Sequence, residues 1–126
     1  MNIGITFDCG PLVALESRNR RILTVLANAK RDGVIITVPA VVLAEWWRGD
    51  PRQATILASI TIIEPTSGRI AQLAGEAIKA IPSATPIDAI VMASAAQRGD
   101  IVYTDDVKDL QTLQTYFPAV SRVLHS

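Results

Sequence analysis

The sequence has little cysteine and little histidine, with one residue of each among 126. Because the single cysteine, Cys9, has no partner in the chain, an internal disulfide is excluded and a reducing compartment is indicated. Zinc sites are built from clusters of His and Cys, and no such cluster is present. His125 therefore fits a surface residue better than a metal ligand.

An excess of charge of either sign is also missing. Lys+Arg and Asp+Glu number 12 each, so any contact with nucleic acid must come from local basic patches. No apolar run reaches membrane-spanning length, and the N-terminal segment meets Asp8 before it could form the apolar core of a signal peptide. We expect a cytoplasmic protein with no membrane contact.

The chain is rich in apolar residues for its size. At 126 residues it suffices for one domain with a genuine core, so residues 1–126 are interpreted as a single domain. Hydrophobic residues make up 49%, which predicts that a partner or a second copy covers part of the surface. Trp46 and Trp47 diverge by about a hundred degrees on a helix, so at least one is predicted to face a partner groove or a base, with core or edge packing as the alternative.

Short β-branched runs alternate with helical patterns, which is typical of βαβ units and a parallel sheet. Strands are predicted over 3–7, 34–38, 60–64, 101–103 and 120–124. Helices are predicted over 11–16, 20–31, 39–48, 51–58, 69–81, 86–98 and 107–116. Since most strands are apolar on both faces, helices should cover both faces of the sheet. The fold class is α/β.

Acidic side chains follow the predicted strands at the end where open α/β sheets bind ligands. Asp8 comes directly after the first strand, and Asp105 and Asp106 follow the fourth. If these two strands are neighbours, their acids converge. Asp88 lies in the first turn of the sixth predicted helix, and Glu45 interrupts the apolar third helix.

Each acid also has a structural interpretation. Thr85 and Asp88 match the two ends of a capping box, in which the acid only satisfies backbone donors. Asp106, with Asp109 three residues on, fits a helix N-cap, and Asp8 fits a turn residue. For each residue taken alone, both interpretations stay open.

Taken together, the acids favour a metal site. Two unit charges about 4 Å apart repel by roughly 4 kcal/mol at an effective dielectric near 20, so clustered carboxylates require a counter-charge. Oxygen ligands alone select a hard cation such as Mg²⁺ or Mn²⁺. On carboxylates, such an ion typically activates water and stabilises the leaving oxygen of a phosphate. The implied reaction is phosphodiester hydrolysis.

Four segments each contain one of these acids. They are 7–16 with Asp8, 38–45 with Glu45, 87–93 with Asp88, and 98–110 with Asp106. In order and spacing the four segments resemble the PIN-domain nucleases and, among them, the VapC-like toxins of bacterial type II toxin–antitoxin pairs. The match extends over nearly the whole chain, and the last segment is the most specific.

The resemblance implies a PIN-like three-layer α/β/α fold with a parallel five-stranded sheet and Mg²⁺ or Mn²⁺ at the acids. It implies a hydrolase, an endoribonuclease that cuts RNA and thereby inhibits translation. It also implies inhibition by a cognate antitoxin, a small DNA-binding protein with a disordered tail. Together with the apolar composition, it predicts a homodimer.

The resemblance also assigns roles to the acids, although relatives usually have a small residue where this chain has Asp105. Spacing to Asp109 gives the fourth role to Asp106, with Asp105 as the alternative. The predicted catalytic set is Asp8, Glu45, Asp88 and Asp106. The predicted metal ligands are Asp8, Asp88 and Asp106. Glu45 then helps to bind the metal or acts as general base.

Supporting residues are predicted around this set. Asp105 or Asp109 assists through the water shell of the metal, and Thr104 orients a carboxylate or a phosphate, with helix capping as its alternative. Candidate RNA ligands are Arg48, Arg52 and Arg98, the arginines nearest in sequence to the acids. The basic run 18–21 contacts RNA phosphates or an acidic partner. Solvated helix ends or faces are the alternative for all of these arginines.

Two other functions compete with the nuclease. An aspartate-based phosphotransfer protein also places acids at strand ends, but a dehalogenase-type phosphatase needs a second Asp where this chain has Gly10, and no central strand ends in the Asp of a receiver domain. A non-catalytic PIN-like binding module is the second alternative. The presence of all four acids argues against the binding module.

Overall fold

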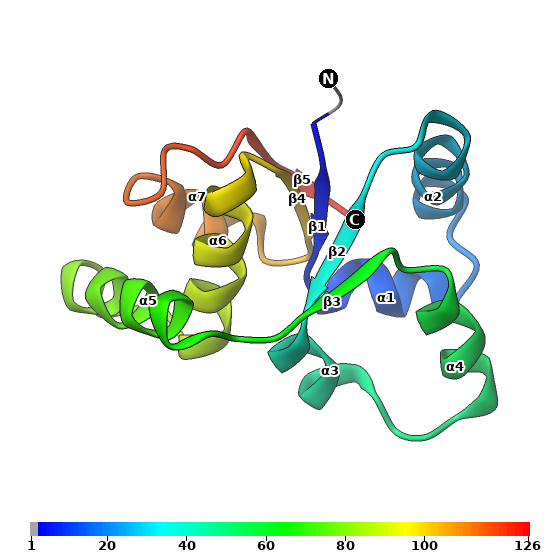
Figure 1. The fold of residues 1–126 in the computed structure, drawn as a ribbon, viewed down its shortest axis with the longest axis horizontal. Coiled ribbons are helices and arrows are strands. Elements are labelled where there is room, and N and C mark those ends of the chain that lie inside the picture. Colours follow the sequence, from blue (N-terminus) through cyan, green and yellow to red (C-terminus); the bar gives the residue numbers. More distant parts are fainter. Residues whose placement is uncertain (1–2) are drawn as a thin grey trace.

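The chain forms a five-stranded parallel sheet in the strand order β3-β2-β1-β4-β5 (Figure 1). The computed structural model describes residues 3–126, so Met1 and Asn2, which open the N-terminal segment considered above, lie outside it. The strands are β1 Ile5–Phe7, β2 Ile36–Pro39, β3 Ile62–Glu64, β4 Ile101–Thr104 and β5 Arg122–His125. The predicted α/β class with a parallel five-stranded sheet is confirmed.

Helices cover both faces of the sheet (Figure 1). In chain order they are α1 Cys9–Glu16, α2 Arg20–Asp32, α3 Ala40–Trp46, α4 Pro51–Ala58, α5 Gly68–Ala80, α6 Pro86–Arg98 and α7 Val107–Gln114. Helices α5, α6 and α7 pack on one side, and α1, α2 and α4 on the other, while α3 lies at the end of β2. Within residues 3–126, no helix is both long and apolar enough to cross a membrane.

Local chemistry explains where the helices begin and end. The side chain of Asn19 accepts hydrogen bonds from two backbone N–H groups at the start of α2, and Ser67 and Thr85 cap α5 and α6 in the same way. Gly33 and Gly99 end α2 and α6 with φ of 68° and 72°, a left-handed conformation that favours glycine. The predicted helices are therefore found, with ends shifted by a few residues.

Four of the five strands begin two residues later than predicted. They are the first three and the last, which runs from Arg122 instead of Val120. The residues just before these strands have irregular backbone, and some of them, such as Ile3 and Ile35, are apolar although exposed. Hydrophobicity alone does not distinguish a strand from the apolar residues that precede it.

The centre of the sheet sets the position of the acids. Strand β1 lies between β2 and β4 and pairs with both in parallel, with Phe7 opposite Tyr103. All three residues of β1 are buried, as expected for a strand covered on both faces. Since β1 and β4 are parallel neighbours, the residues that follow them meet at one edge of the sheet.

Candidate metal centre

Four elements each bring one acid to the same cavity. Asp8 follows β1, Asp106 follows β4, Asp88 comes from the first turn of α6, and Glu45 comes from α3. The cavity measures about 180 Å³, and the described residues that line it are Asp8, Cys9, Gly10, Val13, Glu45, Asp88, Asp105 and Asp106. No lysine, arginine or histidine is among these lining residues, so the cavity is strongly acidic.

Three of the acids form a compact triad. One carboxylate oxygen each from Asp8, Asp88 and Asp106 lies within 4.8 Å of the other two. Asp8 is 4% exposed, Asp88 is half-buried, and Asp106 is open to solvent. The triad therefore extends from the protein interior to the surface, and solvent reaches it from the side of Asp106.

Helix capping does not account for these carboxylates. Asp106 occupies the N-cap position of α7, yet its side chain makes no capping hydrogen bond, and the same holds for Asp8 at the start of α1. At α6 the cap is Thr85, whose hydroxyl accepts from the backbone N–H of Asp88 at 3.2 Å. The carboxylates of all three acids are thus directed to one another, against the purely structural alternative.

Thr104 connects the two strand ends of the site. Its buried hydroxyl donates to Oδ2 of Asp8 at 2.8 Å and accepts from the backbone N–H of Asp106 at 2.9 Å. The hydroxyl therefore contacts a carboxylate, as predicted, while the alternative, helix capping, is not observed because Asp106 is the N-cap of α7. One hydroxyl fixes the rotamer of Asp8 and the backbone that presents Asp106.

Replacement of Thr104 by valine should weaken the site without changing its charge. Valine has the same shape but leaves the N–H of Asp106 and one oxygen of Asp8 without this partner, which should cost about 1–2 kcal/mol of stability. Loss of a partner that orients a metal ligand typically lowers metal affinity by 10–100-fold, and calorimetric titration with Mn²⁺ would measure it. Thr104→Ser keeps the hydroxyl and is expected to stay near wild type; equal losses in both variants would contradict the role.

The electrostatics of the cavity disfavour three full negative charges. Burial, followed by the charges of Asp8 and Asp106, raises the pKa of Asp88 to about 6. Burial is also the main cause that raises the pKa of Asp8 and of Glu45, with smaller contributions from neighbouring acids. All three carboxyl groups are shifted in the direction that a nearby cation would reverse.

The donor set fits a divalent metal. Three carboxylates converge, Thr104 donates a hydrogen bond to one of them, and no cationic side chain lines the cavity within residues 3–126. Cys9 lines the cavity too, but burial raises the pKa of its thiol to about 11, so at neutral pH it offers neither a thiolate ligand nor a nucleophile. A hard cation held by oxygen is the chemistry these residues support.

Comparison with solved structures places the fold. The crystal structure of VapBC2 from Rickettsia felis bound to a DNA fragment from their promoter has a chain that matches with a TM-score of 0.75 at 14% identity, covering 98% of this chain and 99% of that one. DNA-bound VapBC from Salmonella typhimurium matches with a TM-score of 0.73 at 12% identity, covering 98% of each chain. The chain has the PIN-domain fold.

A third match agrees with the first two. FitAcB from Neisseria gonorrhoeae has a TM-score of 0.57 at 18% identity, covering 95% of this chain and 96% of that one. No protein-family model matches the chain, and no curated protein matches it in sequence. At these low identities the PIN-domain fold rests on three-dimensional similarity, and the expected three-layer architecture is confirmed at that level.

Within the PIN-domain fold, Asp105 and Asp106 occupy different positions. Asp106 belongs to the triad, whereas Asp105 lines the cavity from the side of Gly10 and accepts a hydrogen bond from the hydroxyl of Ser126. Gly10 leaves no room for a side chain, because a Cβ there would lie 2.6 Å from Cγ of Asp105 and 2.8 Å from its backbone nitrogen. Asp109 lies outside the cavity and lines an adjoining one beyond Asp88.

The three predicted RNA-binding arginines do not line the acidic cavity. Arg48 donates to backbone carbonyls of its own helix end, at Ala44 and Trp47, and Arg52 donates to the carbonyl of Glu16. Both are exposed. They lie on the surface near the helices of the acid motifs, and their part in RNA binding stays a prediction.

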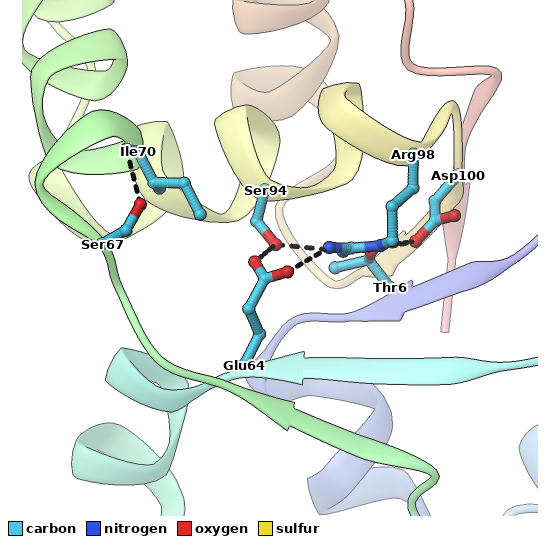
Figure 2. A network of polar contacts seen from close by, with 7 residues as sticks. All are labelled: Thr6, Glu64, Ser67, Ile70, Ser94, Arg98 and Asp100. Atoms are coloured by element: carbon cyan, nitrogen blue, oxygen red, sulfur yellow. Dashed lines mark hydrogen bonds and ion pairs between the residues drawn. The ribbon is translucent and has the colours of Figure 1, made fainter.

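Arg98 lies in a polar network inside the fold (Figure 2). Its guanidinium pairs with Glu64 at 2.5 Å and Asp100 at 2.9 Å, and donates to the hydroxyls of Thr6 and Ser94 at 3.0 Å each. With four such partners, Arg98 connects β3, α6 and the central strand β1. Arg98 therefore has a structural role, and its guanidinium has few donors left for a phosphate.

The adjacent tryptophans differ in burial although their rings lie close, with centroids 6.2 Å apart; Trp46 ends α3 and Trp47 is its extended C-cap, so the expected helical spacing does not apply. Trp46 is buried, and its Nε1 donates to Oε1 of Glu16 at 2.5 Å, while Trp47 keeps 38% of its surface exposed. Trp46 therefore takes the core-packing alternative. That Trp47 faces a partner or a base stays a prediction.

Two residues beside Asp105 are not predicted as part of the site from the sequence. Gly10 approaches Asp105 closely, and the hydroxyl of Ser126 donates a hydrogen bond to it. The strand pairing of Thr104 with His125 brings the end of β5 beside the acids. No local pattern encodes this, because it depends on which strand neighbours β4; a known strand order would have revealed it.

Proposed function

We propose that the protein is a Mg²⁺- or Mn²⁺-dependent endoribonuclease that hydrolyses RNA phosphodiester bonds. The observation that carries the proposal is the triad of Asp8, Asp88 and Asp106, with oxygens within 4.8 Å of one another in an acidic, solvent-open cavity of a PIN-domain fold. A cluster of this kind has no structural purpose in the capping of its helices. Its position at the carboxyl edge of the sheet is where α/β proteins bind ligands.

Each residue then has a distinct task. Asp8, Asp88 and Asp106 hold the metal, which when bound neutralises phosphate charge and lowers the pKa of water. Thr104 keeps one oxygen of Asp8 occupied and so turns the other toward the cavity. Glu45 lines the same cavity from α3, and its raised pKa suits a general base that takes a proton from the attacking water.

We also propose that this ribonuclease is the toxin of a VapBC-type pair. The chains it resembles come from complexes described as VapBC and FitAB, both bound to DNA. By this proposal a small DNA-binding antitoxin inhibits the enzyme, the enzyme inhibits translation in the cytoplasm by cutting RNA, and two copies form a dimer. The exposed Trp47 and the apolar surface residues Val13 and Leu23 are available for such contacts.

Metal removal tests the nuclease directly. Purified protein is incubated with a mixture of structured and single-stranded RNAs in Mn²⁺, in Mg²⁺ and in EDTA, and the products are sequenced at their ends. We expect internal cleavage in either metal, no cleavage above background in EDTA, and recovery when Mn²⁺ is restored in excess.

Background cleavage is measured with the Asp8→Asn protein purified in parallel. This control accounts for contaminating ribonucleases. Cleavage that persists in EDTA, or that is equal in the Asp8→Asn protein, would reject the proposal. Binding of Mn²⁺ with no cleavage of any RNA would instead favour a non-catalytic binding module.

A further inference from the structure

A small basic edge lies beside the acidic cavity and includes two arginines of the basic run 18–21, for which the sequence predicts contact with RNA phosphates or an acidic partner. It consists of Arg20 and Arg21 in the first turn of α2 and of His125 at the end of β5, and we call it the basic edge. NH2 of Arg21 lies 3.2 Å from Nδ1 of His125, and Nε2 of the same ring lies 4.0 Å from Oδ1 of Asp105. Asp105 in turn lines the acidic cavity. These contacts therefore place the basic edge next to Asp105, at the margin of the acidic cavity.

The geometry holds Arg21 in place and leaves donors free. Both of its recorded hydrogen bonds use NH2, one to His125 and one to the backbone oxygen of Ser126 at 2.8 Å. Among residues 3–126, no acceptor is recorded for its Nε or NH1. Arginine presents five N–H donors in a fixed fork that matches a phosphate, so a substrate could bind the unused ones bidentately.

Helix stability does not explain these arginines. Cations are unfavourable in the first turn of a helix, where the macrodipole is positive, and the first turn of α2 contains Arg20 and Arg21 but no acid. The side chain of Asn19 already caps this end by accepting from the N–H groups of Arg21 and Ile22. Within residues 3–126, no Asp or Glu side chain pairs with either arginine, and Nε and NH1 of Arg21 are left for a ligand.

We propose that the basic edge binds the phosphate backbone of single-stranded RNA next to the bond being cut, with Arg21 as the main ligand and His125 as its positioning residue. This inference rests on the proposed function. Acids that hold a metal contact only the phosphate of the cleaved bond. An RNA strand that leaves the cavity past Asp105 would then pass His125 and Arg21. RNA is favoured over an acidic protein segment because a nuclease must bind phosphates on at least one side of its metal site.

Salt-dependent binding tests the proposal independently of cleavage. The affinity of a fluorescent 12-nucleotide RNA is measured by anisotropy in Ca²⁺, and again in EDTA, over a series of salt concentrations. For Arg21→Ala we expect about fivefold weaker binding near 0.1 M salt, and a slope of log affinity against log salt that is smaller by about 0.7, the loss of one phosphate contact on a single strand. His125→Ala should show a smaller loss in the same direction.

The matched control is Arg122→Ala. Arg122 is exposed and lies on the same strand as His125, but at the other end, in register with Ile101. This variant loses the same charge and should keep the affinity and salt slope of wild type. Thermal melts should show all variants folded at the assay temperature; Arg21→Lys, which keeps the charge, serves if Arg21→Ala does not fold, and it should retain the slope.

The outcomes are separable. An unchanged slope in Arg21→Ala, or the same change in Arg122→Ala, would overturn the basic edge. An oligo-glutamate peptide that binds wild type as tightly as the RNA, and loses the same affinity in Arg21→Ala, would assign the edge to an acidic protein and overturn it as well. If wild type fails to cleave in Mn²⁺ but Arg21→Ala still lowers the slope, the proposed nuclease fails while the RNA site stands.

Discussion

Asp88→Asn should abolish RNA cleavage and at the same time make the metal-free protein more stable. Asparagine keeps the shape of the side chain and removes one of three carboxylate charges that lie within 4.8 Å of one another. Even partners outside the ligand set of a metal cost 10–100-fold in activity, so loss of a ligand should cost at least about a hundredfold. The opposite signs of the two effects are what a functional cluster predicts, because a structural acid would lose stability.

The sign of the stability change follows from the pKa. The pKa of Asp88 lies at about 6 in the folded protein against an ordinary value of 3.8, so the folded state binds the extra proton between these values. The free energy of unfolding of the metal-free protein should therefore fall as pH rises from about 4 to about 6. Above that range the charged carboxylate is a cost, which Asp88→Asn removes.

Thermal melts in EDTA and in Mn²⁺ would measure this. At pH 7.5 in EDTA we expect Asp88→Asn to melt about 4 °C higher than wild type, which corresponds to roughly 1 kcal/mol in a domain of this size. At pH 4.5 the difference should be clearly smaller, and added Mn²⁺ should raise the melting temperature of wild type only. Glu76→Gln, an exposed charge loss on α5, is the control. A lower melting temperature for Asp88→Asn in EDTA would contradict repulsion within the triad.

Much of the fold is encoded in short stretches of sequence. The alternation of β-branched runs and helical patterns predicted every strand and helix, because capping side chains such as Asn19 and glycines such as Gly99 act over a few residues. Strand starts were predicted too early, since apolar residues such as Ile3 and Ile35 precede the strands in irregular backbone. What sequence could not supply was the neighbour of each strand, which is why the contact of β5 with the acids was missed.

The site shows the same division. The convergence of Asp8, Asp88 and Asp106 was expected from their places at element ends, and the structure brings them together. Which of Asp105 and Asp106 joins the triad could not be predicted in this way. The two residues are adjacent after the same strand, and only the direction of their side chains distinguishes them. That direction is fixed by Thr104, whose hydroxyl accepts from the N–H of Asp106, and by the close approach of Gly10 to Asp105.

Arg98 illustrates where proximity in sequence misleads. It stands a few residues before the acids of the fourth motif, which suggested a contact with RNA. In three dimensions a helix end and a whole strand, β4, separate it from Asp106, and its guanidinium lies among Glu64, Ser94 and Asp100 (Figure 2). Distance along the chain does not report which end of the sheet a side chain reaches.

Arg98→Ala should be the most destabilising single change outside the apolar core. Asp100 is 2% exposed, and its Oδ2 accepts from Arg98 Nε at 2.9 Å and from the hydroxyl of Thr6 at 2.7 Å. Glu64 pairs with the same guanidinium at 2.5 Å. Removal of the cation leaves two carboxylates without their counter-charge, and loss of one partner from a buried pair costs about 3–5 kcal/mol.

Because the side chain of Arg98 is 26% exposed, the lower end of that range applies, about 3 kcal/mol, or a melting temperature lower by about 12 °C. Arg31→Ala is a matched control, since Arg31 also lies in the last turn of a 13-residue helix that ends in a left-handed glycine. Its pair with Asp32 has side chains 70% and 51% exposed, so its loss should leave the midpoint of unfolding essentially unchanged. Urea unfolding of the two variants would measure the difference, and equal losses would show that the network around Arg98 does not hold β1, β3 and α6 together.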